Sequence, residues 1–321
     1  MKDAFSREID YMRISVTDRC NLRCKYCMPE TMPYVPHEKI LRKEEFLRVC
    51  KLASEMGVKN IRVTGGEPLV RLGVMDLLRE IKKLPLVERL TLTTNGVLLE
   101  QHAEELADLK LDGVNISLDT LNAETFRNLT GVDAFAAVWR GIEAVLKTDM
   151  RVKLNCVPLR GINESELAEI AALAETRRLD VRFIEAMPVG EGKGFDPIDG
   201  ESILRELLSV YPDLKKDDEK RGSGPAMYYN GPLAGSIGFI SAISSCFCEK
   251  CNRVRLTSTG MLKLCLYYDD NLDLRWLLRN GASDDEIKKA MMDAVLKKPE
   301  KHEFSVEQLP PERKKMWQIG G

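Results

Sequence analysis

The chain has 321 residues, 44% of them apolar, which is enough for one large α/β domain or two smaller ones. Its 48 basic and 50 acidic residues leave a net charge of -2, and this balance predicts neither a nucleic-acid nor a membrane partner. No apolar run reaches the roughly 20 residues of a membrane helix, and the charged first residues lack the apolar stretch of a signal peptide. We therefore expect a cytoplasmic protein.

Strand-like and helix-like segments alternate over the first 186 residues. Strands are predicted at residues 11–17, 61–64, 89–94, 114–118, 151–157 and 181–186. Helices are predicted at residues 43–56, 74–84, 102–109, 134–147 and 163–177. Asn163 followed by Glu166 predicts a capping box at the start of the last of these helices. The alternation predicts a parallel sheet, and six strands rather than eight indicate an incomplete barrel or an open doubly wound sheet.

The pattern changes after residue 187. A glycine-rich stretch at 190–194 predicts a flexible connection, and residues 215–224 are charged and rich in turn formers. Short strands at 236–241, 253–257 and 261–266 follow, with helices predicted at 272–278 and 284–297. Residues 302–317 show little regular pattern. The change predicts a first domain over residues 1–190 and a C-terminal extension over residues 191–321.

Nine cysteines indicate metal chemistry rather than a disulfide framework in a cytoplasmic chain. Cys20, Cys24 and Cys27 directly follow the first predicted strand, at the end where parallel α/β folds place their sites. Three thiolates can hold three irons of a [4Fe-4S] cluster and leave the fourth iron open to another ligand. A zinc site is the alternative, but structural zinc takes four protein ligands, and no nearby residue is an obvious fourth.

A second group of cysteines, Cys248, Cys251 and Cys265, is also one short of a closed zinc site. Cys246 could complete a zinc ribbon, and otherwise the group predicts a second cluster with an open iron. Arg253 and Arg255 lie two apart on a predicted strand, so both can face one anion. An exposed edge strand with two solvated arginines is the alternative. Cys50, Cys156 and Cys246 are otherwise interpreted as core or surface residues.

The string Cys20-Asn-Leu-Arg-Cys24-Lys-Tyr-Cys27 resembles the CxxxCxxC signature of radical S-adenosylmethionine (SAM) enzymes. In that superfamily the open iron binds SAM, and SAM cleavage gives a 5′-deoxyadenosyl radical that abstracts hydrogen from the substrate. The string Gly65-Gly66-Glu67-Pro68 resembles the SAM-binding motif of the same superfamily. By position, the resemblance implies SAM contacts at Tyr26, Gly66, Ser117 and Met187.

The strings SVTDRCNLRCKYCMP, TGGEPL, TTNG, NISLD, RFIE and CNRVRL together resemble the GTP 3′,8-cyclases. The resemblance runs from Arg13 to Gly321 and implies an incomplete (β/α)6 TIM-like barrel with a C-terminal β-containing extension. It also implies a lyase with two [4Fe-4S] clusters and SAM as cofactors. The implied reaction converts GTP to (8S)-3′,8-cyclo-7,8-dihydroguanosine 5′-triphosphate, the first step of molybdopterin and molybdenum cofactor biosynthesis.

The same resemblance assigns roles to individual residues. It implies GTP contacts at Arg13, Arg62, Thr93, Lys153, Arg253, Val254 and Arg255. The guanine would bind the open iron of the second cluster, and a tail ending in Gly320 and Gly321 would reach the active site. Asn60 stands where some members carry a lysine near the triphosphate, which leaves open whether Lys59 replaces that contact. The family also suggests a homodimer, a reducing electron donor and a downstream pathway enzyme as partners.

Two other function classes remain to be weighed. A radical SAM peptide-modifying enzyme also carries C-terminal cysteines for auxiliary clusters, although such domains usually hold about seven and this region holds four. A zinc-stabilised binding module would make no use of the Gly65–Pro68 segment and would be colourless after anaerobic purification.

Overall fold

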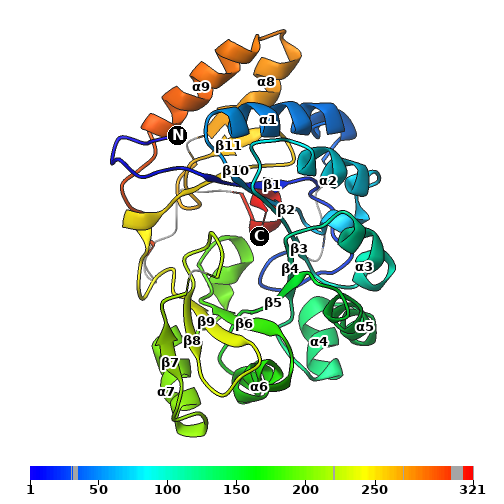
Figure 1. Cartoon of the computed structure of the whole chain (residues 1–321), viewed down its shortest axis with the longest axis vertical. Coiled ribbons are helices and arrows are strands. Elements are labelled where there is room, and N and C mark those ends of the chain that lie inside the picture. Colours follow the sequence, from blue (N-terminus) through cyan, green and yellow to red (C-terminus); the bar gives the residue numbers. More distant parts are fainter. Residues whose placement is uncertain (30, 32–34, 220, 270, 305–313, 321) are drawn as a thin grey trace. The chain divides into compact units, whose positions relative to one another are not determined.

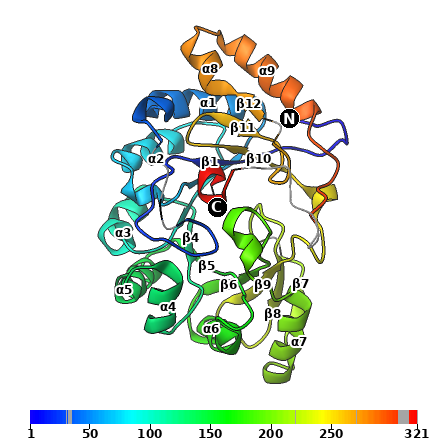
Figure 2. The same cartoon turned by 180° about the vertical axis from the view of Figure 1, so that it is seen from behind.

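The computed structural model describes residues 1–29, 31, 35–219, 221–269, 271–304 and 314–320 (Figures 1 and 2). The chain folds into two compact units. Unit 1 consists of Met1–Asn21, Cys27–Thr93 and Cys248–Gly321, and unit 2 of Leu22–Tyr26 and Thr94–Phe247. Each unit contains more than one segment of the sequence, and segments of the two units alternate along the chain. The expected division at residue 190 stays a prediction.

Unit 1 is built on strands from both ends of the chain. Its strands are β1 (Tyr11–Ser15), β2 (Asn60–Thr64), β3 (Arg89–Thr94), β10 (Arg253–Leu256), β11 (Met261–Lys263) and β12 (Asn271–Asp273). Its helices are α1 (Lys43–Glu55), α2 (Val74–Lys82), α8 (Leu274–Arg279), α9 (Asp284–Leu296) and α10 (Met316–Ile319). The strand order is β12-β11-β10-β1-β2-β3, in which β10, β1, β2 and β3 are parallel and β11 and β12 are antiparallel additions.

Unit 2 has the same plan. Its strands are β4 (Gly113–Ser117), β5 (Arg151–Cys156), β6 (Leu179–Ile184), β7 (Lys215–Asp217), β8 (Met227–Asn230) and β9 (Ser236–Ile240). Its helices are α3 (Leu99–Asp108), α4 (Ala123–Thr130), α5 (Phe135–Leu146), α6 (Leu167–Thr176) and α7 (Gly200–Val210). Strands β4, β5, β6 and β9 are parallel, and β8 and β7 continue the sheet antiparallel.

The two faces of β1 explain why a site forms in unit 1. Met12 and Ile14 are fully buried, and because side chains alternate along a strand they share one face. Tyr11 and Arg13 lie on the other. Helix α1 contributes buried Phe46 to the core and packs beside α2 and α9 (Figure 1). One face of the sheet is therefore apolar, and the other carries charged and polar side chains.

All six strands predicted for the first half are present, with ends shifted by a few residues. The predicted capping box is wrong. Asn163 instead accepts a hydrogen bond from the Leu159 amide and donates to the Asp119 carbonyl. Glu166 accepts hydrogen bonds from Thr120 and the Leu121 amide. Both side chains form hydrogen bonds with loop residues, and in each case these include residues far away in the sequence. These tertiary hydrogen bonds replace those of the predicted capping box.

Three helices among the described residues were not predicted: α4, α7 and the four-residue α10. Asn122 is the N-cap of α4, and its side chain accepts hydrogen bonds from the amides of Glu124 and Thr125. Asp199 is the N-cap of α7, and its side chain accepts a hydrogen bond from the Ser202 amide. The glycine-rich stretch predicted as a flexible connection forms a short 3-10 helix, Gly190–Gly194. Among the described residues, no helix is long and apolar enough to cross a membrane.

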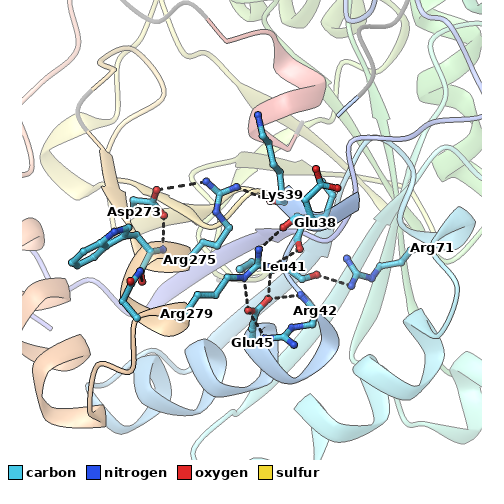
Figure 3. A network of polar contacts seen from close by, with 12 residues as sticks. Glu38, Lys39, Leu41, Arg42, Glu45, Arg71, Asp273, Arg275 and Arg279 are labelled. Carbon is cyan, nitrogen blue, oxygen red and sulfur yellow. Dashed lines mark hydrogen bonds and ion pairs between the residues drawn. The ribbon is translucent and has the colours of Figure 1, made fainter. Parts of the chain in front are cut away.

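Arginines fix the segment that leads from the first cysteine loop into α1 (Figure 3). Four consecutive carbonyls, from Glu38 to Leu41, each accept a hydrogen bond from a guanidinium. Arg279 serves Glu38 and Ile40, Arg275 serves Lys39, and Arg71 serves Leu41. Arg71 also donates to the carbonyl of Val16, just after β1. The entry to α1 is thus joined to both β1 and α8.

Candidate active site

The first cysteine set consists of Cys20, Cys24 and Cys27, and all three are half-buried and form no disulfide with a described residue. In unit 2 the backbone on both sides of Cys24 is anchored to the end of α4. The amide of Arg23 donates to the Thr130 carbonyl at 2.7 Å, and the amide of Lys25 donates to the Leu129 carbonyl at 3.0 Å. Unpredicted α4 therefore holds the part of the loop that carries Cys24.

Tyr26 is held by a residue to which the sequence analysis assigned no role. Its hydroxyl donates to Oδ2 of Asp119 at 2.6 Å, and Oδ1 of Asp119 accepts from the Val157 amide at 2.8 Å. Burial raises the pKa of Asp119 to about 6, although both hydrogen bonds oppose that shift. A cavity of about 20 Å³ is lined in part by Cys24, Tyr26, Asn95, Ser117, Asp119 and Thr120. Ser117 and Tyr26, two predicted SAM contacts, thus share one cavity with a cluster cysteine.

Met187, the third predicted SAM contact in unit 2, is half-buried after β6. A Cβ on Gly192 would lie 2.6 Å from the Met187 carbonyl oxygen and 3.7 Å from that of Tyr26. The turn at 190–194 therefore packs directly on the backbone of Met187. Phe195, which follows that turn, meets the Tyr26 ring edge-on at 6.2 Å between centroids.

Gly65 and Gly66 are required by the fold of unit 1 itself. A Cβ on Gly66 would lie 2.5 Å from the Arg19 carbonyl oxygen, and one on Gly65 would lie 2.8 Å from that of Thr17. The Gly66 amide donates to Thr17 and the Glu67 amide to Arg19. The glycines let this loop pack on the turn immediately before Cys20. From the sequence, these glycines were expected to matter only for the approach of a ligand.

Basic side chains form a row across four strands of unit 1. Arg13 on β1 pairs in register with Arg255 on β10 and Arg62 on β2, and Arg255 pairs with Lys263 on β11. Residues paired in this way point to the same face of a sheet. We call Lys263, Arg255, Arg13 and Arg62 the basic row. Arg253 lies two residues before Arg255 on that face, so Arg253 adds a fifth cation beside it.

Burial and mutual repulsion act on the charges of this row. Among the described residues, neither Arg62 nor Arg255 forms an ion pair with a carboxylate. Burial, together with repulsion from Arg253, lowers the pKa of Arg255 to about 10. Burial and repulsion from Arg255 lower the pKa of Arg13 well below its ordinary value. Buried cations that repel one another create a site for a multiply charged anion.

Tyr11 lies among the same cations. Burial alone would raise its pKa, but Arg62, Arg13, Arg253 and Arg255 together lower it below the ordinary value. The guanidinium of Arg62 stacks 5.5 Å from the centre of the Tyr11 ring and donates to Thr91. Val254 is fully buried on the opposite face of β10, so only its backbone is open to a role in the site.

Thr93 and Lys153, the other predicted GTP contacts, differ in their surroundings. The hydroxyl of Thr93 is buried with no hydrogen-bond partner among the described residues, so it is suited to bind a ligand. Lys153 in unit 2 donates to Asp180 at 2.6 Å and to the Tyr228 hydroxyl at 2.8 Å. Burial lowers its pKa in spite of the Asp180 ion pair. Lys153 as a GTP contact stays a prediction.

The second cysteine set consists of Cys248, Cys251 and Cys265 in unit 1. Cys248 is buried and the other two are half-buried. The amide of Cys251 donates to the Cys248 carbonyl at 3.0 Å, which closes a turn directly before β10. Burial would raise the pKa of Cys251, but Lys298 and Arg253 lower it below the ordinary value. A lowered thiol pKa suits a metal ligand, since the thiolate is the binding form.

Gly320 lies against the carboxyl ends of β1 and β2. Its carbonyl accepts a hydrogen bond from Arg255 at 2.8 Å, and its φ is 88°. A Cβ there would lie 2.9 Å from Ser15 and 3.0 Å from Thr64, so glycine is required for the close approach. Figure 2 shows short α10 beside β1. Gly321 lies outside the described residues.

The structure shows the surroundings of five residues whose roles the sequence left open. Lys59 pairs with Glu88 at 2.8 Å and precedes Asn60, whose side chain donates to Asp10. Asn60 and Arg62 share a face of β2, and Lys59 is therefore directed away from the basic row. Cys50 and Cys156 are fully buried, and burial raises the pKa of Cys50 to about 12. Both act as core residues, whereas Cys246 is exposed.

The residues present fit the expected cofactors. Each cysteine set offers three thiols, and none of the six forms a disulfide among the described residues. Three thiolates leave one iron of a [4Fe-4S] cluster open. The cavity beside Cys24 is lined by the phenol, hydroxyl and carboxyl groups of Tyr26, Ser117 and Asp119, and these can hydrogen-bond a polar ligand.

Comparison with known proteins agrees with this geometry. Residues 14–174 match the radical SAM superfamily, and residues 179–304 match the family described as Molybdenum Cofactor Synthesis C. A GTP 3′,8-cyclase of Clostridium perfringens is 42% identical over 323 residues, and one of Desulforamulus reducens is 46% identical over 327. Both alignments cover 100% of this chain and 100% of the relative.

Solved structures show the same fold at low identity. The TM-score is 0.60 to Streptococcus suis SuiB bound to the precursor peptide SuiA, at 17% identity over 95% of this chain and 75% of that chain. It is also 0.60 to native anSMEcpe with bound AdoMet, at 19% identity over 92% and 82%. Together with the match of residues 14–174 to the radical SAM superfamily, they confirm a radical SAM partial barrel with an antiparallel β extension. On the full-length matches, the chain belongs to the GTP 3′,8-cyclase family of the radical SAM superfamily.

Proposed function

We propose that this chain cyclises GTP to (8S)-3′,8-cyclo-7,8-dihydroguanosine 5′-triphosphate, the step that opens molybdenum cofactor biosynthesis. The observation that carries this proposal is the basic row with Arg253, five cations on one face of unit 1. A triphosphate supplies the concentrated negative charge that such a site requires. Proteins solved with a bound peptide share the fold, but a peptide ligand would not require these cations.

The first cysteine set would hold the cluster that binds and cleaves SAM. When bound, this cluster supplies the electron that splits SAM and so produces the 5′-deoxyadenosyl radical. Tyr26, Gly66, Ser117 and Met187 are the proposed SAM contacts. Asp119 fixes the Tyr26 ring through the phenol. The loop of Gly65 and Gly66 fixes the turn before Cys20.

The second cysteine set would hold the cluster that binds the guanine. The proposed triphosphate and ribose contacts are Arg13, Arg62, Thr93, Lys153, Arg253, Val254 and Arg255. Arg62 and Arg255 reach the ligand without first breaking an ion pair, since the described residues give them none. Gly320 and Gly321 are proposed as the tail that completes the site. Arg255 would then bind both the tail and the nucleotide.

The proposal includes partners and a location. A reducing protein would supply electrons, a downstream pathway enzyme would take the product, and the active species would be a homodimer. A cytoplasmic location is supported by the nine cysteines, none of which forms a disulfide with a described residue, as is usual for proteins of a reducing compartment.

Anaerobic incubation of the reconstituted protein with SAM, GTP and dithionite tests the function by mass analysis. We expect 5′-deoxyadenosine together with a cyclised nucleotide of the same mass as GTP. Cys24→Ala should form neither product. If 5′-deoxyadenosine forms while GTP is unchanged, the cyclase assignment is wrong and a peptide substrate becomes the next candidate.

A further inference from the structure

Two buried cations donate hydrogen bonds to the backbone at or beside the second cysteine set, and neither has a role in the function proposed above. Arg7 precedes β1, and Lys298 follows α9 by two residues. Arg7 is 8% exposed and Lys298 is 3% exposed. Lysine and arginine are almost never buried to this degree unless they are paired. Their partners therefore indicate what they are for.

Lys298 connects the segments that carry two of the cysteines. Its ammonium donates to the carbonyl of Arg253 at 3.0 Å and to the carbonyl of Leu264. Arg253 lies two residues after Cys251, and Leu264 immediately precedes Cys265. One ammonium thus fixes the spacing between Cys251 and Cys265, which are far apart in sequence.

Arg7 holds the third cysteine. Its guanidinium donates to the Cys248 carbonyl at 2.9 Å and to the carbonyls of Pro299 and Glu300, both at 2.6 Å. Its Nε pairs with Asp3 at 2.6 Å. Because Pro299 and Glu300 directly follow Lys298, the two cations share one chain segment. Arg7 and Lys298 together therefore reach the backbone at or beside all three cysteines.

The charge of Lys298 has no carboxylate partner among the described residues. Two carbonyl dipoles alone compensate poorly for a buried ammonium. Three thiolates and the cluster they bind carry net negative charge, which increases by one on reduction. A fixed cation beside them stabilises the reduced state, since net charge and surrounding groups set cluster potentials.

We propose that Arg7 and Lys298 are positioning residues for the second cluster, holding its three ligands in register and raising its reduction potential. This inference rests on the proposed function, because it assumes that Cys248, Cys251 and Cys265 bind iron. It assigns to the residues before β1 and after α9 a role in the auxiliary cluster site that is separate from binding of the nucleotide.

The test uses the full chain with Cys20, Cys24 and Cys27 changed to serine, so that bound iron reports the second set alone. Lys298→Met, Arg7→Met and Arg7→Lys are made in this background. Matched controls are Lys288→Met, which breaks the surface ion pair with Glu55, and Arg48→Met, which breaks the one with Asp284. Far-UV circular dichroism compares the fold of every variant with the parent.

Iron loss to a chelator is the first readout, and a redox titration followed by electron paramagnetic resonance is the second. We expect Lys298→Met and Arg7→Met to lose iron about tenfold faster than the parent, as is usual for groups that orient metal ligands. Lys298→Met should also lower the reduction potential. Arg7→Lys keeps the charge but cannot reach all three carbonyls, and should speed iron loss with a smaller change in potential.

The outcomes separate this inference from the function on which it rests. If the parent binds no iron, the second cluster assignment fails and the positioning role fails with it. If the parent binds iron and the variants match their controls in rate and potential, only the positioning role is overturned. Should Lys298→Met not fold, Arg7→Lys still decides the question, since it retains the cation and most of the side-chain volume.

Discussion

At the scale of single residues, the orientation of each cation decides whether it belongs to the basic row. Arg62 is a member of this row, whereas Lys59, three residues earlier, forms an ion pair with Glu88 on the other side of β2. The two positions differ in orientation and not in charge. The sequence left open whether Lys59 contacts the triphosphate. Substitutions of Arg62 and of Lys59 can now be compared to answer this question.

We expect Arg62→Met to weaken GTP binding at least tenfold, since truncating one partner of a buried charge contact costs about 2 kcal/mol or more. Iron content and SAM cleavage without GTP should stay unchanged. Lys59→Met is the matched control and should bind GTP like the parent. Calorimetric titration with GTP measures both variants, and equal losses would show that the row is not the triphosphate site.

At the scale of elements, the loop after β2 shapes the loop after β1. Gly66→Ala places a methyl group where the Arg19 carbonyl lies, 2.5 Å away, so the turn before Cys20 must move. We expect this variant to lose most of its first cluster and to keep the second. Gly194→Ala, with no atom within 4 Å of the added Cβ, should retain both.

Iron content and Mössbauer spectra distinguish the two clusters in the Gly66→Ala protein. Full loading of the first cluster would mean that the turn tolerates the shift, and Gly66 would then matter only through contact with SAM.

Helices α1 and α8 are joined by Glu45, which accepts from Arg279 at 2.7 Å and is 7% exposed (Figure 3). Burial would raise its pKa, but Arg279 and Arg42 lower it to about 2. A carboxyl whose pKa is lowered by folding stabilises the protein fully when the pH is above its pKa in the unfolded chain, about 4.3. This stabilisation is lost as the pH falls toward 2. Glu45→Gln should therefore lower the free energy of unfolding by up to about 3 kcal/mol at pH 7.

Urea unfolding of parent and Glu45→Gln proteins at pH 7 and at pH 3 measures this difference. It should shrink at the lower pH, because the Glu45 carboxyl of the unfolded chain is protonated at pH 3 and folding must then release that proton. Arg48→Met, which removes the more exposed link from α1 to Asp284, should change stability by less than about 1 kcal/mol. A difference that stays constant with pH would exclude the ion pair as its source.

The sequence predicted what depends on local pattern and missed what depends on distant contacts. The six strands of the first half follow from apolar runs and were placed correctly. The pairing of β10 with β1 was not predicted, because the two strands are separated by more than 230 residues. Asn163 and Glu166 fit a capping pattern, yet both bind loops that only the fold brings near.

The candidate site divides in the same way. The cysteines, arginines and glycines carry recognisable spacings, so sequence could name them. Asp119, Arg7 and Lys298 act through hydrogen bonds to residues far along the chain. No spacing rule marks such residues, and their burial as charged groups is the signal that identifies them in a structure.

At the scale of the whole molecule, the proposed function is one radical reaction that uses both cysteine sets. Unit 1 carries the basic row, the second cysteine set and Gly320, and unit 2 carries Cys24, Tyr26, Ser117 and Met187. SAM cleavage without GTP chemistry would need only part of this arrangement. Hydrogen transfer from GTP to the adenosyl group would need all of it.

The most direct test is anaerobic turnover with GTP deuterated at the ribose 3′ carbon, followed by mass analysis of the 5′-deoxyadenosine. We predict one deuterium in the 5′-deoxyadenosine and a cyclised nucleotide that lacks it. 5′-Deoxyadenosine without deuterium, formed by protein that holds both clusters and is saturated with GTP, would contradict the proposed hydrogen transfer from GTP.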